Sequence, residues 1–176
     1  GCTLSNYLQF ISLSKNGSDI TGAIVLDRQT EKEFTIKARQ IVTAGGAWTD
    51  KLGLPQQSLS IAPSKGSHIL LKADRMLPPK AFTMTSPSDR RLVFAVPWYG
   101  TVFLGTTETP YKGDPSQPLV TKEDAKYLLE TINHQFPNAN YGEKDIISSQ
   151  AGLRPLIKQK GKPLSKTSRK EQIFRL

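Results

Sequence analysis

Apolar and polar residues alternate along three short stretches in the first part of the chain. These stretches cover residues 7–14, 20–26 and 33–38, and an Asn-Gly-Ser sequence at 16–18 separates the first two. Asn and Gly tolerate the positive backbone φ that tight hairpin turns require. Alternation of period two with short polar connections predicts an antiparallel meander of three strands.

A short apolar run at 40–44 follows the meander and ends at Gly45 and Gly46. An uninterrupted apolar run of this length is typical of a buried strand, so we predict one here. Two adjacent glycines remove the side chains where the backbone turns, which lets another group approach the main chain. On composition alone they indicate a tight turn, which would lead into a short helix around 49–52.

After Pro55 the pattern predicts a second set of strands. They are expected over residues 67–72, 91–96, 102–106 and 145–149. A hairpin at 97–101 would join the second and third, and the last would lead into a turn at 152–155, where Gly and Pro interrupt the apolar pattern.

The clearest helical pattern covers residues 122–136. Thr121 is a good N-cap residue, and Asp124 at the third helical position supports the cap electrostatically. Pro137 ends the pattern. One face carries the apolar residues Ala125, Leu128, Leu129, Ile132 and Phe136. A mixed, largely antiparallel sheet with this helix packed on one face makes an α+β fold.

The net charge of +9 is concentrated at the C-terminal end. Residues 158–176 carry +6 of it and contain one aromatic residue, Phe174. A basic tail can bind polyanions without sequence specificity, but one aromatic ring provides no platform on which bases stack. The composition therefore favours a solvated tail over a nucleic-acid site. The start of the chain lacks the basic and apolar pattern of a secretory signal, and no apolar run is long enough to span a membrane.

His68 and Arg154 are the residues best suited to chemistry. Imidazole can remove a hydroxyl proton as hydride leaves carbon, and a guanidinium can hold a phosphate with two parallel hydrogen bonds. From the residues alone, a structural histidine and a salt-bridged arginine remain alternatives. His134 lies off the apolar helix face and is expected to be exposed and inert. Two histidines and the single Cys2 do not make a metal site.

Three segments follow one another along the chain: 64–68 (Ser-Lys-Gly-Ser-His), 105–115 (Gly-Thr-Thr-Glu-Thr-Pro-Tyr-Lys-Gly-Asp-Pro) and 151–156 (Ala-Gly-Leu-Arg-Pro-Leu). In this order they resemble the substrate-binding half of FAD-dependent glycerol-3-phosphate dehydrogenases, members of the D-amino-acid-oxidase-like flavoproteins. The resemblance runs from about Leu4 to about Arg169. It implies oxidation of glycerol 3-phosphate to dihydroxyacetone phosphate by hydride transfer to the flavin.

The resemblance also implies roles for individual residues. His68 would be the general base. The substrate would be bound by Arg154, Arg169 and Thr107. The residues near the FAD would be Gly45, Gly46, Thr106 and Gly152.

The glycine-rich turn that holds the FAD pyrophosphate in this family does not occur in these residues. Because the family's N-terminal arginine segment, its later lysine-bearing stretch and its cap domain are missing too, we interpret the chain as an excised middle portion. Alone, it would be inactive and would not bind FAD. We expect a remnant of the FAD-binding domain at 1–53, the substrate-binding domain at 54–157, and a basic loop with a returning strand at 158–176.

Partners and location rest on the resemblance. It implies a phosphorylated small-molecule substrate, a quinone or oxygen as electron acceptor, no nucleic acid, and a cytoplasmic enzyme at the inner face of the membrane. An uncovered sheet edge favours pairing, so we also expect a homodimer. The alternatives are a related flavin oxidase of a glycerophosphate, hydroxy acid or amine, and a non-catalytic anion- or nucleic-acid-binding module that uses the basic tail.

Overall fold

The computed structural model describes residues 1–52, 60–73, 79–158 and 173 of the 176-residue chain. The chain forms two compact units, which divide between Ile61 and Ala62. The domain limits expected from the sequence, after residues 53 and 157, stay predictions. Within the described ranges, no helix is both long and apolar enough to cross a membrane.

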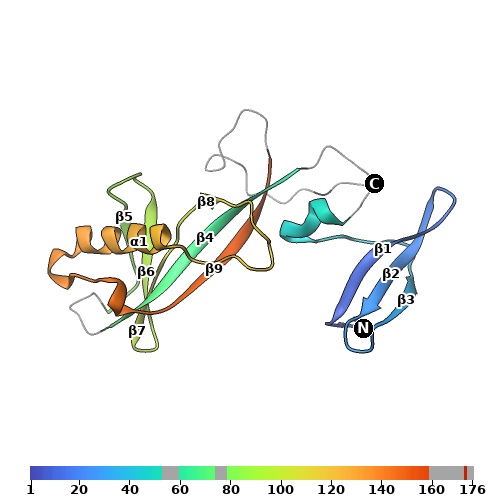
Figure 1. Ribbon diagram of the computed structural model, residues 1–176, viewed down its shortest axis with the longest axis horizontal. Coiled ribbons are helices and arrows are strands. Elements are labelled where there is room, and N and C mark those ends of the chain that lie inside the picture. Colours follow the sequence, from blue (N-terminus) through green and yellow to red (C-terminus); the bar gives the residue numbers. More distant parts are fainter. Residues whose placement is uncertain (53–59, 74–78, 159–172, 174–176) are drawn as a thin grey trace. The chain divides into compact units, whose positions relative to one another are not determined.

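The first unit contains a three-stranded antiparallel sheet (Figure 1). Its strands are β1 (Leu8–Asn16), β2 (Asp19–Asp27) and β3 (Lys32–Lys37). Asn16 pairs with Asp19 across the first turn, where Gly17 has a φ of +61°. This positive φ is the conformation for which glycine is suited. The predicted meander is therefore confirmed.

Residues 40–44 are not a strand, so that prediction was wrong. They have no regular structure, and the Val42 side chain is 85% exposed. A strand needs a neighbouring strand to satisfy its backbone hydrogen-bonding groups. None of the described strands pairs with this run. The short helix expected around 49–52 is a 3₁₀-helix, η1 (Gly46–Lys51).

The second unit is built on a six-stranded sheet. Its strands are β4 (Ile61–Lys72), β5 (Phe82–Thr85), β6 (Leu92–Trp98), β7 (Thr101–Gly105), β8 (Thr109–Pro110) and β9 (Ile146–Ile157). Hydrogen bonds join them in the order β5-β6-β7-β4-β8, and β9 also pairs with β4. The pairs β5–β6, β6–β7, β4–β7 and β4–β8 are antiparallel.

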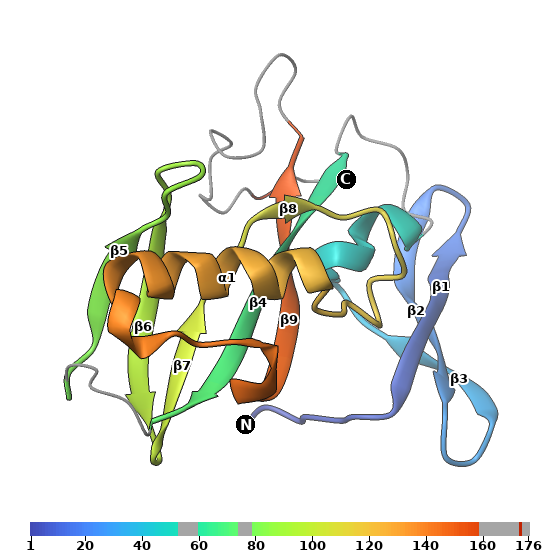
Figure 2. The same ribbon diagram turned by 60° about the vertical axis from the view of Figure 1, so that its left-hand side comes forward.

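The helix α1 (Lys122–Gln135) lies across one face of this sheet (Figure 2). Thr121 caps it, because its hydroxyl accepts a hydrogen bond from the Asp124 backbone N–H while the Asp124 carboxylate accepts one from the Thr121 N–H. This reciprocal arrangement is a capping box. The short helices η2 (Pro137–Ala139) and η3 (Glu143–Asp145) lead from α1 to β9. The predicted α+β fold is confirmed, and His134 is exposed as expected.

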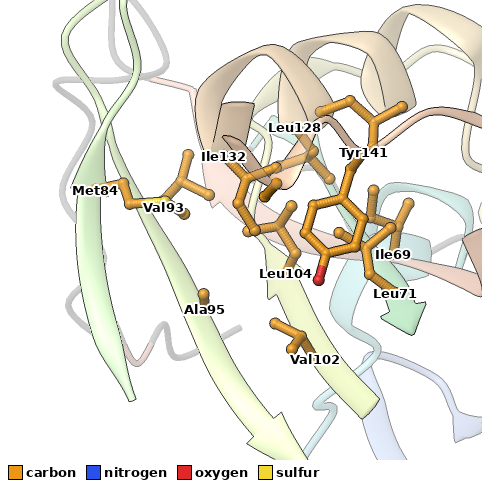
Figure 3. Packing of buried hydrophobic residues seen from close by; sticks show 12 residues of the cluster. Ile69, Leu71, Met84, Val93, Ala95, Val102, Leu104, Leu128, Ile132 and Tyr141 are labelled. Carbon is orange, nitrogen blue, oxygen red and sulfur yellow. The ribbon is translucent and has the colours of Figure 1, made fainter. Parts of the chain in front are cut away.

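The hydrophobic core of the second unit lies between α1 and the sheet (Figure 3). It contains Ile69 and Leu71 of β4, Met84, Val93, Ala95, Val102 and Leu104 of β5–β7, Leu128, Leu129 and Ile132 of α1, and Ala139 and Tyr141. Side chains alternate between the two faces of a strand. Because Ile69 and Leu71 face α1, His68 and Gly66 lie on the opposite face of β4.

A buried ion pair fastens α1 to β4. The Lys65 Nζ lies 2.5 Å from the Asp124 carboxylate, and both side chains are at most 6% exposed. The Ser67 hydroxyl donates to the same carboxylate oxygen at 2.9 Å. Burial raises the pKa of Asp124, but hydrogen bonds from Lys65, Thr121 and Ser67 outweigh it and leave the pKa below its ordinary value. The two residues on either side of Gly66 are thus held by the helix.

The turn predicted at 152–155 is wrong, because β9 runs through these residues without a break. Gly and Pro are poor strand formers, which is why they predicted a turn. Among the described strands β9 pairs only with β4. A proline is tolerated on such an edge strand, where its missing N–H is not needed by a neighbour.

Candidate active site

A hollow of about 410 Å³ lies beside β4 and β9. Gly66 and His68 of β4 line it, together with residues 150–154 of β9. These residues come from distant parts of the chain, and they meet because β4 and β9 pair. The two side chains best suited to chemistry, those of His68 and Arg154, therefore line the same hollow.

The segment after β7 holds the Arg154 guanidinium. Its Nη2 donates to the Thr106 hydroxyl at 3.1 Å, and its Nη1 donates to the Thr107 carbonyl at 3.4 Å. The guanidinium also passes close to Gly66, where an added Cβ would lie 2.5 Å from Nη2 and 2.6 Å from Nη1. The missing side chain at Gly66 thus makes room for Arg154.

The imidazole of His68 lies over Gly105 of β7. These residues pair directly across the β4–β7 ladder, and a Cβ at Gly105 would overlap the ring. Burial lowers the pKa of His68, and the positive charge of Arg154 lowers it further. The lowered pKa favours the neutral form of the ring, and a neutral imidazole can accept a proton.

The three candidates Thr106, Thr107 and Gly152 have different surroundings: only Gly152 lines the hollow, and Thr107 lines a different pocket. Thr106 contacts Arg154 through its hydroxyl, and Gly152 lines the hollow. The Thr107 hydroxyl instead accepts a hydrogen bond from the Ser67 backbone N–H at 3.0 Å, and the residue is 4% exposed. Its side chain is thus engaged within the sheet. The binding roles of all three remain predictions.

The other candidates lie elsewhere. Gly45 and Gly46 belong to the first unit, where Gly46 has a φ of +54° at the start of η1. Arg169, with most of the basic tail, lies outside the described residues. In the part of the chain that the structure describes, no group of three or more His, Cys, Asp or Glu side chains could hold a metal ion.

Sequence reasoning gave no role in the site to Gly66, Gly105 or Phe103, although the two glycines lie in segments that carry the resemblance. A signal was present for Gly105, which lies inside the strand expected at 102–106, since a glycine inside a strand pattern often marks a close approach of another group. Gly66 lies just before the strand expected at 67–72 and had no such signal. No local pattern could identify Phe103. Its contact with His68 depends on how β4 and β7 pair.

Gly66→Ala is expected to destabilise the second unit by about 1 kcal/mol, the usual scale of a lost hydrogen bond, because the new methyl group would displace the flexible end of the Arg154 side chain from Thr106. The Arg154 guanidinium should move away from Thr106. Urea unfolding followed through the methyl NMR signals of Ile69 and Leu71 measures the first effect, and the Arg154 side-chain NMR signals report the second.

Gly152→Ala is the control, because a Cβ there would meet nothing within 4 Å. We expect its stability to change by no more than about 0.5 kcal/mol. Equal effects of the two substitutions would contradict the close approach of Arg154 to Gly66.

The chain is similar to glycerol-3-phosphate dehydrogenases. It is 35% identical over 179 residues to the aerobic glycerol-3-phosphate dehydrogenase of Staphylococcus aureus, in a match that covers 99% of this chain and 32% of that protein. The X-ray structure of the Bacillus halodurans glycerol-3-phosphate dehydrogenase complexed with FAD matches with a TM-score of 0.82 and 34% identity. That match covers 88% of this chain and 32% of that one.

A more distant structure shares the fold. The glycine oxidase of Bacillus cereus matches with a TM-score of 0.59 and 21% identity, over 85% of this chain and 37% of that one.

The chain spans about a third of the length of its curated relatives. Residues 1–174 match the DAO family, described as FAD dependent oxidoreductase. Because this match covers nearly all of its residues, the chain belongs to the DAO family of FAD-dependent oxidoreductases.

Proposed function

We propose that this chain forms the substrate-binding part of an FAD-dependent glycerol-3-phosphate dehydrogenase. One observation carries the proposal: His68 and Arg154 line the same hollow on two paired strands. The first offers a neutral imidazole and the second a fixed positive charge. In the oxidation of a phosphorylated secondary alcohol, such a base can take the hydroxyl proton and such a charge can bind the phosphate, while FAD would accept the hydride. The similarity to glycerol-3-phosphate dehydrogenases supports the same substrate.

Each residue has one task in the proposed reaction. Arg154 binds the substrate phosphate through its guanidinium and so orients the carbon chain in the hollow. His68 accepts the proton of the C2 hydroxyl as hydride leaves that carbon, which gives the ketone. Thr106 holds the guanidinium in place. Thr107 acts through its backbone carbonyl, which accepts a hydrogen bond from Arg154.

Hydride acceptance is the chemistry that FAD supplies when it is bound. The described residues of the second unit leave room for the flavin ring beside the hollow. Beside Gly152 there is open space, since an added Cβ would meet nothing within 4 Å. We therefore assign Thr106 and Gly152 to the flavin ring.

The proposal extends to partners and location. The electron acceptor would be a quinone or oxygen, the enzyme would be a homodimer, and it would act in the cytoplasm at the inner face of the membrane. The chain alone would be inactive. The homodimer rests on the expected uncovered sheet edge, and the other statements rest on the resemblance to the family.

Calorimetric titration of the chain with glycerol 3-phosphate tests the proposal, beside titrations with glycerol, inorganic phosphate and glycine. We expect glycerol 3-phosphate to bind more tightly than glycerol, because only the former has a phosphate for Arg154. Inorganic phosphate should compete with it. If glycine or glycerol bound as tightly as glycerol 3-phosphate, the assignment of a phosphorylated substrate would be wrong.

A further inference from the structure

The His68 ring packs against a second ring on the face of the sheet opposite α1. The imidazole and the Phe103 phenyl ring are stacked, with 4.6 Å between their centroids and 10° between their planes. We propose that Phe103 is a positioning residue for His68, and that Phe103 and Gly105 together form a slot that fixes the plane of the imidazole. The catalytic part of this inference rests on the proposed function of His68.

The pairing of β4 with β7 creates the slot. His68 pairs with Gly105, and Leu70 pairs with Phe103. Residues two apart on a strand share a face, so Phe103 and Gly105 both lie on the face that carries His68. A side chain at position 105 would overlap the Cγ, Cδ2 and Nε2 region of the imidazole. Glycine at this position thus lets the ring lie down on the sheet, where Phe103 covers it.

A phenyl ring on β6 lies on the other side of Gly105. Gly105 also pairs with Phe94 of β6, whose neighbours Val93 and Ala95 face the core. Phe94 therefore lies on the face of His68, and it is half exposed. Across β4, β7 and β6 the order is imidazole, glycine and phenyl. The space that glycine leaves between two large side chains is the space into which the imidazole extends.

A fixed ring plane has a consequence for proton transfer. A general base must lie within hydrogen-bond reach of the proton that it accepts, and with the right direction. The nitrogens of an imidazole lie in the ring plane, so fixing that plane fixes their directions. Phe103 also covers one face of the ring and keeps water from it, which favours the neutral imidazole. Phe103 thus acts through His68 and touches no substrate atom in this scheme.

Simple packing is the competing interpretation. Any apolar side chain could cover the sheet, and leucine would do so nearly as well as phenylalanine. Only a flat ring can stack nearly parallel to an imidazole. A leucine and a tyrosine at position 103 therefore distinguish the two interpretations.

Histidine ring NMR of the whole chain tests the slot. The chain has two histidines, and His134 on the exposed face of α1 supplies a second signal that the changes should not affect. In the unchanged chain we expect nuclear Overhauser contacts between the His68 and Phe103 rings and between His68 and Gly105. The pKa of His68 should lie below that of the same residue in the urea-unfolded chain.

Phe103→Leu should weaken the contacts between His68 and Gly105 and move the pKa of His68 up toward its unfolded value. Phe103→Tyr should retain both. If Phe103→Leu left both unchanged, or if the unchanged chain lacked the ring contacts, the inference would be wrong. The ring contacts between His68 and Phe103 are measured in the unchanged chain, so they test the slot even if Phe103→Leu does not fold. These NMR measurements are made without substrate. A negative result for the slot can therefore be told apart from a failure of glycerol 3-phosphate to bind.

Discussion

Replacing Arg154 by alanine is expected to lower the affinity for glycerol 3-phosphate by about 100-fold, the usual scale for losing one partner of a close charge pair. The guanidinium is held at the hollow by Thr106 and the Thr107 carbonyl, so the phosphate meets a group that is already oriented. Arg154→Lys should recover only part of the loss, because an ammonium group cannot donate two parallel hydrogen bonds. Calorimetric titration measures all three affinities.

Arg91→Ala is the matched control for Arg154→Ala. It removes the same charge from the same unit, but Arg91 forms ion pairs with Asp89 and Glu108 and lines a different pocket. A phosphate bound at Arg154 would lose little affinity in this variant. Equal losses in the two variants would show that the net positive charge of the domain, and not a site at Arg154, attracts the ligand.

Asp124→Ala is expected to destabilise the second unit by about 3–5 kcal/mol, because it leaves the Lys65 ammonium buried without its partner. The same carboxylate also accepts hydrogen bonds from Ser67 and Thr121, so the change loosens both β4 and the start of α1. Urea unfolding followed through the methyl NMR signals of Ile69 and Leu71 measures the loss in the unit that carries the ion pair.

Two controls separate the ion pair from other effects. Lys65→Met combined with Asp124→Leu removes both charges and should be far less damaging than Asp124→Ala alone. Glu130→Ala breaks the exposed Lys126–Glu130 pair of the same helix and should cost no more than about 0.5 kcal/mol. A double variant as unstable as Asp124→Ala would contradict the role assigned to the unpaired Lys65 charge.

The pH dependence of stability gives an independent check on Asp124. Its pKa is lowered in the folded chain, so between the two pKa values the unfolded chain binds more protons. The contribution of this carboxylate is present above its unfolded pKa of about 3.9 and is lost as the pH falls through the folded value. Urea unfolding in this acidic range should show a steeper loss of stability in the unchanged chain than in Asp124→Ala.

Features that depend on neighbouring residues in the sequence could be predicted. The meander, the β6–β7 hairpin and α1 with its Thr121 cap all follow from patterns within about 15 residues, and the structure contains each of them. Turn chemistry, capping and periodicity act over that range. Tertiary contacts therefore stabilise these elements without changing their type. The order of three segments was also enough to indicate the family to which the chain belongs.

Features that depend on a partner strand could not be predicted. The apolar run at 40–44 has the composition of a strand but no described strand beside it, and it stays irregular. Residues 152–155 contain the Gly and Pro of a turn, yet pairing with β4 keeps them in a strand. In both cases the outcome depends on what lies next to the segment in space.

The amino-acid sequence by itself predicted most of the local elements, indicated the family, and singled out His68 and Arg154 as candidate site residues. The tertiary structure decided that His68 and Arg154 line one hollow, that Gly66 and Gly105 make room for them, and that Phe103 stacks on the imidazole. The physical reason is strand pairing. The register of β4 with β7, and its pairing with β9, sets which distant side chains share a face, and no local pattern encodes that choice.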